Sequence, residues 1–140
     1  MRGRRKTIVT IFASGLLLMT YPAFVLGYTW SHVGRSDLPG GRNGPLDAYR
    51  HTLASAVVAF TLSPRAVEWV TVLMEFGGSE ESVMDRHNNR LGSFIGSTVS
   101  SFAEIEPTVR AKVLGGATNG ADPAHASWLG PEHWGDGWLW

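Results

Sequence analysis

The chain has 140 residues, with 12 basic and 12 acidic side chains, so its formal net charge is zero. This length fits one small domain. A neutral chain lacks the basic surface that nucleic-acid binding needs, so nucleic acid is not expected as a partner. The chain has no cysteine, which excludes a disulfide framework, a thiolate zinc site and a cysteine nucleophile.

The first 27 residues have the pattern of an export segment. Four cations lie within residues 2–6, and no charged residue follows from Thr7 to Thr29. A basic head before an apolar run is typical of a signal peptide or a membrane anchor whose following domain lies outside the cytoplasm. Cleavage before Tyr28 and retention as an anchor both stay open, with a buried core helix as a third alternative. The expected location is periplasmic, secreted or membrane-anchored, with a membrane or cell-envelope component as partner.

Residues 28–44 are expected to be a glycine-rich linker, with turn-forming residues throughout GRSDLPGGRNG at 34–44. Proline is well suited to the first position of a helix, so Pro45 marks a helix start with Asn43 or Gly44 as its cap.

Four helices are expected in the domain that spans residues 45–116. Their ranges are 45–62, 64–76, 79–101 and 107–115. Serine and proline at 63–64 end one helix and begin the next, and the glycine pair at 77–78 precedes Ser79, a favourable cap. No strand-like alternation is present. The predicted fold is therefore all-α, a small helical bundle with an N-terminal signal or anchor helix and an irregular Trp- and Gly-rich tail at 117–140.

Two of these helices carry polar residues beside an apolar stripe. In the helix from Pro45, Asp47 and His51 share one face, with Arg50 at its edge. In the helix from Ser79, Asp85 and Asn89 share one face. Burying both apolar stripes would bring these side chains together, with Glu75 at the end of the intervening helix close by.

Two glycines favour close contact between these helices. Gly92 and Gly96 lie on the face of Asp85 and remove side chains where another helix could approach. His87 lies about 160° around the helix from Asp85, so it is expected outside the polar cluster.

The candidate catalytic residues are His51, Asp47, Arg50, Glu75, Asp85 and Asn89. His51 would be a general base or a metal ligand, and the aspartates would orient it or share the metal. Arg50 would balance negative charge on the substrate or the site. Carboxylates with one imidazole suit a divalent metal, so His51, Asp47 and Asp85 are the candidate ligands.

Two functions are consistent with this set. One is a metal-assisted or general-base hydrolase acting on lipid, lipid-linked phosphate or cell-wall substrates. The alternative is a non-catalytic envelope protein whose polar cluster is structural, because buried polar groups often satisfy one another. No G-x-S-x-G nucleophile motif is present.

The pattern D-A-x-R-H, then a glutamate, then M-D-x-H-N-N-x-x-G resembles a bacterial domain of uncharacterised function. That domain occurs in secreted proteins and at the C-termini of polymorphic toxins. The matching positions are Asp47, Ala48, Arg50, His51, Glu75, Met84, Asp85, His87, Asn88, Asn89 and Gly92. The run from Ser82 to Gly96 is also similar to one helix of the VanZ-like envelope proteins. Both resemblances imply an envelope setting and a polar site, without a reaction.

Overall fold

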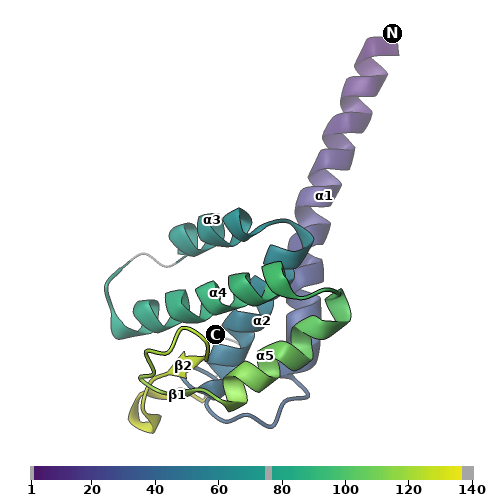
Figure 1. The fold of residues 1–140 in the computed structure, drawn as a ribbon. Helices are drawn as coiled ribbons and strands as arrows, with labels where there is room; N and C mark the ends of the chain where they lie inside the picture. Colours follow the sequence, from purple (N-terminus) through teal and green to yellow (C-terminus); the bar gives the residue numbers. More distant parts are fainter. Residues whose placement is uncertain (1, 75–76, 137–140) are drawn as a thin grey trace.

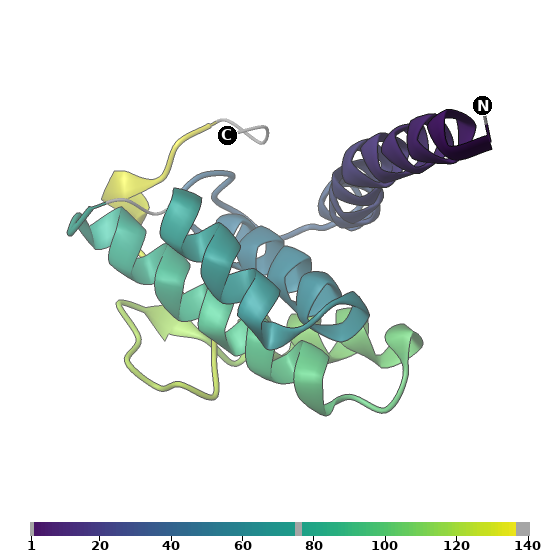
Figure 2. The ribbon, with the colours of Figure 1, turned by 90° about the horizontal axis from the view of Figure 1, so that it is seen from above.

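The computed structural model describes residues 2–74 and 77–136, and helices make up most of this part of the chain (Figure 1). The α-helices are α1 (Arg2–Val33), α2 (Pro45–Thr61), α3 (Pro64–Met74), α4 (Glu80–Thr98) and α5 (Ile105–Leu114). The prediction of a mostly helical fold is confirmed. Seen from above, α3 lies over α2 and α4, and α1 stands to one side of them (Figure 2).

Helices α2 and α4 form the centre of the fold and contact each other more extensively than any other pair of elements described. Gly92 and Gly96 make this contact close. A Cβ added to Gly92 would lie 2.8 Å from the Cβ of Ser55, and one added to Gly96 would lie 2.9 Å from the Cβ of Ala59. Each would also collide with a backbone carbonyl of α2. The predicted packing reason for both glycines is confirmed.

Helix α1 continues to Val33, so the expected linker is shorter than residues 28–44. Val25, Thr29 and Val33 follow one another at four-residue spacing and are buried. This spacing places them on one face of a helix, and burial of that face favours helix over linker. The core of the domain therefore includes part of the N-terminal segment, beyond the expected range of 45–116. None of the helices in the described part of the chain has the length and apolarity of a membrane span.

Aromatic rings join α1 to the rest of the domain. Phe102, which follows α4, lies with its ring centroid 5.0 Å from that of Tyr28 and 6.2 Å from that of Phe24. The ring of Phe60 on α2 lies 5.9 Å from the same Phe102. Rings at these separations interact favourably beyond their burial, so this cluster fixes α1 against the end of the α2–α4 pair.

The helix starts follow the expected caps, with differences at the ends. Gly44 is the cap of α2, and Pro45 occupies its first turn. Ser79 caps α4, and its hydroxyl oxygen accepts a hydrogen bond from the backbone N–H of Ser82. Helix α4 ends at Thr98 instead of 101, because the backbone is extended at Val99.

Helix α5 begins at Ile105, after a short 3-10 turn at Phe102–Glu104, and not at Pro107. Proline is accepted at the third position because the first N–H groups of a helix have no partner within it. The end of the helix from Pro64 was expected at residue 76, and residues 75–76 lie outside the described part.

The tail contains a strand pair that the sequence pattern did not predict. Strands β1 (Ala117–Thr118) and β2 (Ser127–Trp128) pair in parallel. The side chain of Asn88 on α4 extends this pairing. Its Nδ2 donates to the carbonyl oxygen of Ser127 at 2.8 Å, and its Oδ1 accepts from the N–H of Ser127 at 3.0 Å. The described tail is therefore held against α4. Two-residue strands are too short to produce an alternation visible in a sequence.

Candidate functional site

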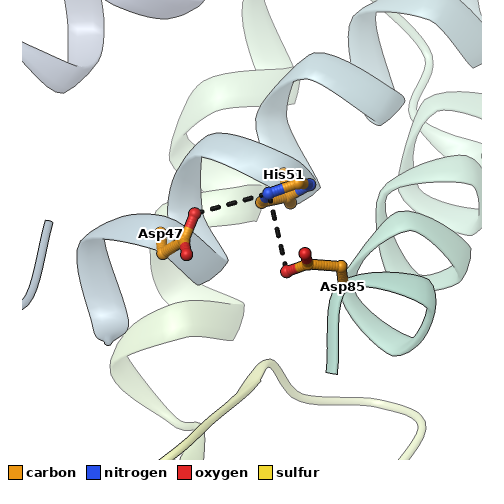
Figure 3. A group of neighbouring side chains, drawn as sticks. All are labelled: Asp47, His51 and Asp85. Atoms are coloured by element: carbon orange, nitrogen blue, oxygen red, sulfur yellow. Dashed lines mark ion pairs between the residues drawn. The ribbon is translucent and has the colours of Figure 1, made fainter. Parts of the chain in front are cut away.

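Helices α2 and α4 bring together an imidazole and two carboxylates (Figure 3). Asp47 lies in the first turn of α2, His51 one turn later, and Asp85 faces them from α4. The Nε2 atom of His51 lies 3.4 Å from Oδ1 of Asp47 and 3.5 Å from Oδ1 of Asp85. The predicted approach of His51 and Asp85 is confirmed.

Local structure positions Asp47 firmly. Its side chain is buried, and its Oδ2 accepts a 2.6 Å hydrogen bond from the backbone N–H of Asn43. Its Oδ1 pairs with Nη2 of Arg50, one turn along α2. A carboxylate in the first turn of a helix also interacts favourably with the helix dipole. These protein contacts fix the position of Asp47 without a bound ligand.

The environment favours the charged form of both Asp47 and His51. Burial is the largest influence on the pKa of Asp47 and raises it. The hydrogen bond and charge of His51, the charge of Arg50 and the hydrogen bond from Asn43 together outweigh burial, so this pKa is lowered. Burial likewise acts most strongly on His51, where it lowers the pKa. The hydrogen bond to Asp47 and the charges of Asp85 and Asp47 outweigh it, and the pKa of His51 is raised.

One nitrogen of His51 faces both carboxylates, and this restricts its chemistry. In a catalytic triad, one imidazole nitrogen binds the orienting carboxylate and the other faces the substrate. Here Nε2 approaches Asp47 and Asp85 together. A cation shared by all three side chains, either a proton on Nε2 or a metal ion, suits this arrangement better than proton abstraction from a substrate through Nε2.

The spacing of these groups suits a metal ion. One donor atom from each of Asp47, His51 and Asp85 lies within 4.8 Å of the others. Ligands at about 2.0–2.2 Å from a common zinc ion lie roughly 3–4 Å apart, so small side-chain adjustments suffice. Among the described residues 2–74 and 77–136, no other group of three or more histidine, aspartate or glutamate side chains has donor atoms this close together. The side chain of His51 is 23% exposed, so the cluster is not sealed from solvent.

The charge of the cluster depends on His51. With a neutral imidazole, the two aspartates and Arg50 sum to one negative charge. A proton on His51 would cancel it, and a divalent cation would change it to one positive charge. Both cations are therefore compatible with the charges that the helices bring together.

Arg50 lies on the buried side of the cluster, toward α1. Besides Asp47, it contacts Trp30 of α1, with its Cζ 5.6 Å from the centre of that ring. A guanidinium over an aromatic face is stabilised by the ring electrons. Arg50 is therefore held between Asp47 and Trp30.

The remaining sequence candidates lie in different places. Asn89 faces α2, where its Oδ1 accepts a hydrogen bond from the hydroxyl of Ser55 at 2.9 Å. His87 lies outside the cluster, as predicted, and its Nε2 donates to the carbonyl oxygen of His125 at 2.8 Å. Glu75 lies outside the described residues.

The sequence pattern did not indicate the contacts of Asn43. Its backbone has a φ of 61°, in the left-handed region that asparagine tolerates better than most residues. Its N–H binds Asp47, and its Nδ2 donates to Glu81 at 3.0 Å and to the carbonyl of His133 at 3.1 Å. The asparagine–glycine–proline sequence at 43–45 was a signal for the turn, although the pattern does not reveal the long-range partners.

Comparison with protein-family models, with curated proteins and with solved structures finds no match in any of the three. The resemblances noted in the sequence therefore stay predictions.

Proposed function

We propose that Asp47, His51 and Asp85 bind a divalent cation and that the protein is a metal-assisted hydrolase of the cell envelope. The observation that carries this proposal is the approach of one imidazole nitrogen to two carboxylates from two different helices. A divalent metal bound by protein ligands can lower the pKa of a bound water to about 7 and so supply a nucleophile. The substrate classes proposed are phospholipids, lipid-linked phosphates and peptidoglycan.

The residues around the cluster would support such a site. Asn43 and Arg50 fix the carboxylate of Asp47, as partners of metal-bound carboxylates commonly do. Trp30 holds Arg50 on the side of α1. His51 and Asp85, which are more exposed than Asp47, would face the open side where a substrate can approach.

The envelope location rests on the basic head and uncharged run of the N-terminal segment, which we propose directs export or anchors the chain. Burial of Val25, which precedes Tyr28, favours retention of this segment over its removal. Cleavage before Tyr28 would take Val25 from the core and leave the neighbouring apolar surface without its cover.

The hydrolase is tested with the purified full chain in detergent. Hydrolysis of a phospholipid, a lipid-linked pyrophosphate and peptidoglycan is measured with added Mg²⁺, Mn²⁺ or Zn²⁺ and with a chelator. We expect turnover of one class that disappears with the chelator and in the Asp85→Asn variant, and that persists in His87→Gln. Activity that survives both Asp85→Asn and the chelator would contradict the proposal.

A structural role for the cluster is the second candidate, and the contacts of Asp47 favour it specifically. Both of its carboxylate oxygens already have protein partners, Asn43 and Arg50. With His51 protonated, the cluster is electrically neutral and needs no further ligand. In that case added Mg²⁺, Mn²⁺ or Zn²⁺ would not change the melting temperature, and substitution of His51 would lower the free energy of unfolding.

A further inference from the structure

A hollow of about 460 Å³ lies where α4, α5 and the loop between β1 and β2 meet. Figure 1 shows this loop beside the first half of α4 and the end of α5. Helix α4 lines the hollow with Arg90, Leu91 and Phe94, α5 lines it with Lys112, and the loop with Pro123. Small-molecule sites commonly have volumes of about 300–1,000 Å³, so the hollow has room for a small organic ligand.

The hollow is separate from the His51 cluster. At 100° per residue, Arg90, Leu91 and Phe94 all lie at least about 120° around α4 from Asp85. Asp85 faces α2, where its carboxylate lies beside His51. A ligand in the hollow would therefore occupy a different side of α4 from the metal ion proposed above.

Hydrogen bonds around the hollow fix its walls. The Nε2 atom of His87 on α4 donates to the carbonyl oxygen of His125 in the loop at 2.8 Å. The backbone N–H of Ala126 donates to the carbonyl oxygen of Lys112 on α5 at 3.2 Å. The loop is thus tied to both helices that line the hollow. A site whose walls are in place before the ligand arrives loses less conformational entropy on binding.

The side chains that carry charge at the hollow are cations. Arg90 and Lys112 come from two different helices, and neither forms an ion pair with a residue in the described part of the chain. Asp122 belongs to the same loop, but its two carboxylate oxygens are bound inside the loop, one by the N–H of Ala124 and one by Nδ1 of His125. The hollow therefore favours an anionic ligand.

Arg90 also lines a neighbouring hollow between α3 and α4. Glu68 lies there, and its negative charge is offset by the positive charge of Arg86, which lines the same hollow. The positive charge of Arg90 is therefore not cancelled from that side.

The apolar side chains of the hollow define the other part of the ligand. Phe94 is 65% exposed, and Leu91 and Pro123 complete an apolar wall beside the two cations. Removal of apolar surface from water stabilises a complex. A ligand with an apolar chain next to its anionic group would cover Phe94 while the anionic group stays between Arg90 and Lys112.

We propose that this hollow binds a phosphate monoester that carries a short apolar chain. Two cations on separate helices match the two negative charges of a phosphate monoester, and arginine and lysine both bind phosphate oxygens well. The apolar chain would lie along Phe94. This binding site is additional to the proposed metal site and does not require it.

The probe is hexyl phosphate, and the comparison ligands are inorganic phosphate, hexanol and hexanoate. Equilibrium dialysis measures their binding to the metal-free full chain in detergent, with the detergent alone as blank. Three substitutions remove the proposed contacts: Arg90→Gln, Lys112→Gln and Phe94→Ser. The matched control is Arg65→Gln, which removes an exposed cation of α3 that does not line the hollow. Circular dichroism verifies the fold of each variant.

We expect one hexyl phosphate per chain, bound at least about tenfold more tightly than each comparison ligand. Each of the three substitutions should weaken binding several-fold, and Arg65→Gln should leave it unchanged. Absence of binding to wild type would overturn the proposal, as would equal binding of inorganic phosphate, hexanol or hexanoate. It would also be overturned if Arg65→Gln weakened binding as much as Arg90→Gln, or if Asp85→Asn abolished binding, which would place the ligand at the His51 cluster. Because the protein is metal-free, none of these results depends on the proposed metal-assisted activity.

Discussion

The Nε2 atom of His51 on α2 lies 3.5 Å from Oδ1 of Asp85 on α4. This contact joins two helices that are separated in the chain by α3, and it depends on how closely they pack. Gly92, two turns beyond Asp85, provides that closeness by leaving room for the backbone of α2. The geometry of the candidate site and the packing of the central helix pair are therefore one structural feature.

The first prediction concerns this packing. Gly92→Ala should destabilise the fold by about 1–3 kcal/mol, because the new methyl group collides with the carbonyl of Thr52 and the side chain of Ser55. Gly27→Ala in α1 is the matched control, since nothing lies within 4 Å of its added Cβ. That control should be stabilising by roughly 0.5–1 kcal/mol, because alanine favours helix over glycine. Chemical denaturation compares the two variants, and equal stabilities would show that the α2–α4 contact is looser than described.

The second prediction is a pH dependence of stability in the metal-free protein. The raised pKa of His51 adds stability that is fully present below its ordinary value of 6.5 and is lost as the pH rises through the folded-state pKa. The lowered pKa of Asp47 adds stability present above its ordinary value of 3.8 and lost as the pH falls through the folded-state pKa. Both contributions are complete between about pH 3.8 and 6.5.

Melting temperatures measured in chelator from pH 4 to pH 9 check this dependence. The difference in melting temperature between wild type and His51→Gln should be largest below about pH 6.5 and should shrink as the pH rises above that value. A difference that is constant over the whole range would mean that His51 does not titrate with the two carboxylates. His87→Gln serves as the control, because that imidazole contacts the tail and not the aspartates.

The third prediction concerns the tail. Asn88→Asp keeps the shape of the side chain and its acceptor for the N–H of Ser127, but it removes the donor to the carbonyl oxygen of Ser127. A buried carbonyl without its partner costs about 1–3 kcal/mol, and a buried charge adds to this. Hydrogen exchange should therefore accelerate at residues 117–130. The exposed neighbour Arg90 provides the control, and if Arg90→Ala has the same effect, the Asn88 contact is not what holds the tail.

The sequence predicted the part of the fold that depends on local rules. Pro45 and Ser79 marked helix starts close to those observed, because caps and turns act over a few residues. Helical period placed Asp47, His51 and Asp85 beside apolar stripes, and burying the stripes brought them together. The same period correctly placed His87 on another face of its helix.

The differences arise where distant contacts decide. Helix α1 runs on to Val33 because its buried residues pack against the domain, which no local signal between 28 and 33 reveals. The hydrogen bonds of Asn88 to the backbone of a tail strand likewise do not follow from its position on α4. Neither that strand pair nor the hydrogen bond from the N–H of Asn43 to Asp47 follows from periodicity, since each involves residues outside the helices.

The most direct test of the central claim is the divalent metal content of the purified full chain in detergent, measured after loading with Zn²⁺ or Mn²⁺ and removal of unbound ion. We predict close to one ion per chain for wild type and for His87→Gln, and loss of that ion in Asp85→Asn, with the fold of each variant verified by circular dichroism. Wild-type protein that retains no ion, or Asp85→Asn protein that retains as much as wild type, would contradict it.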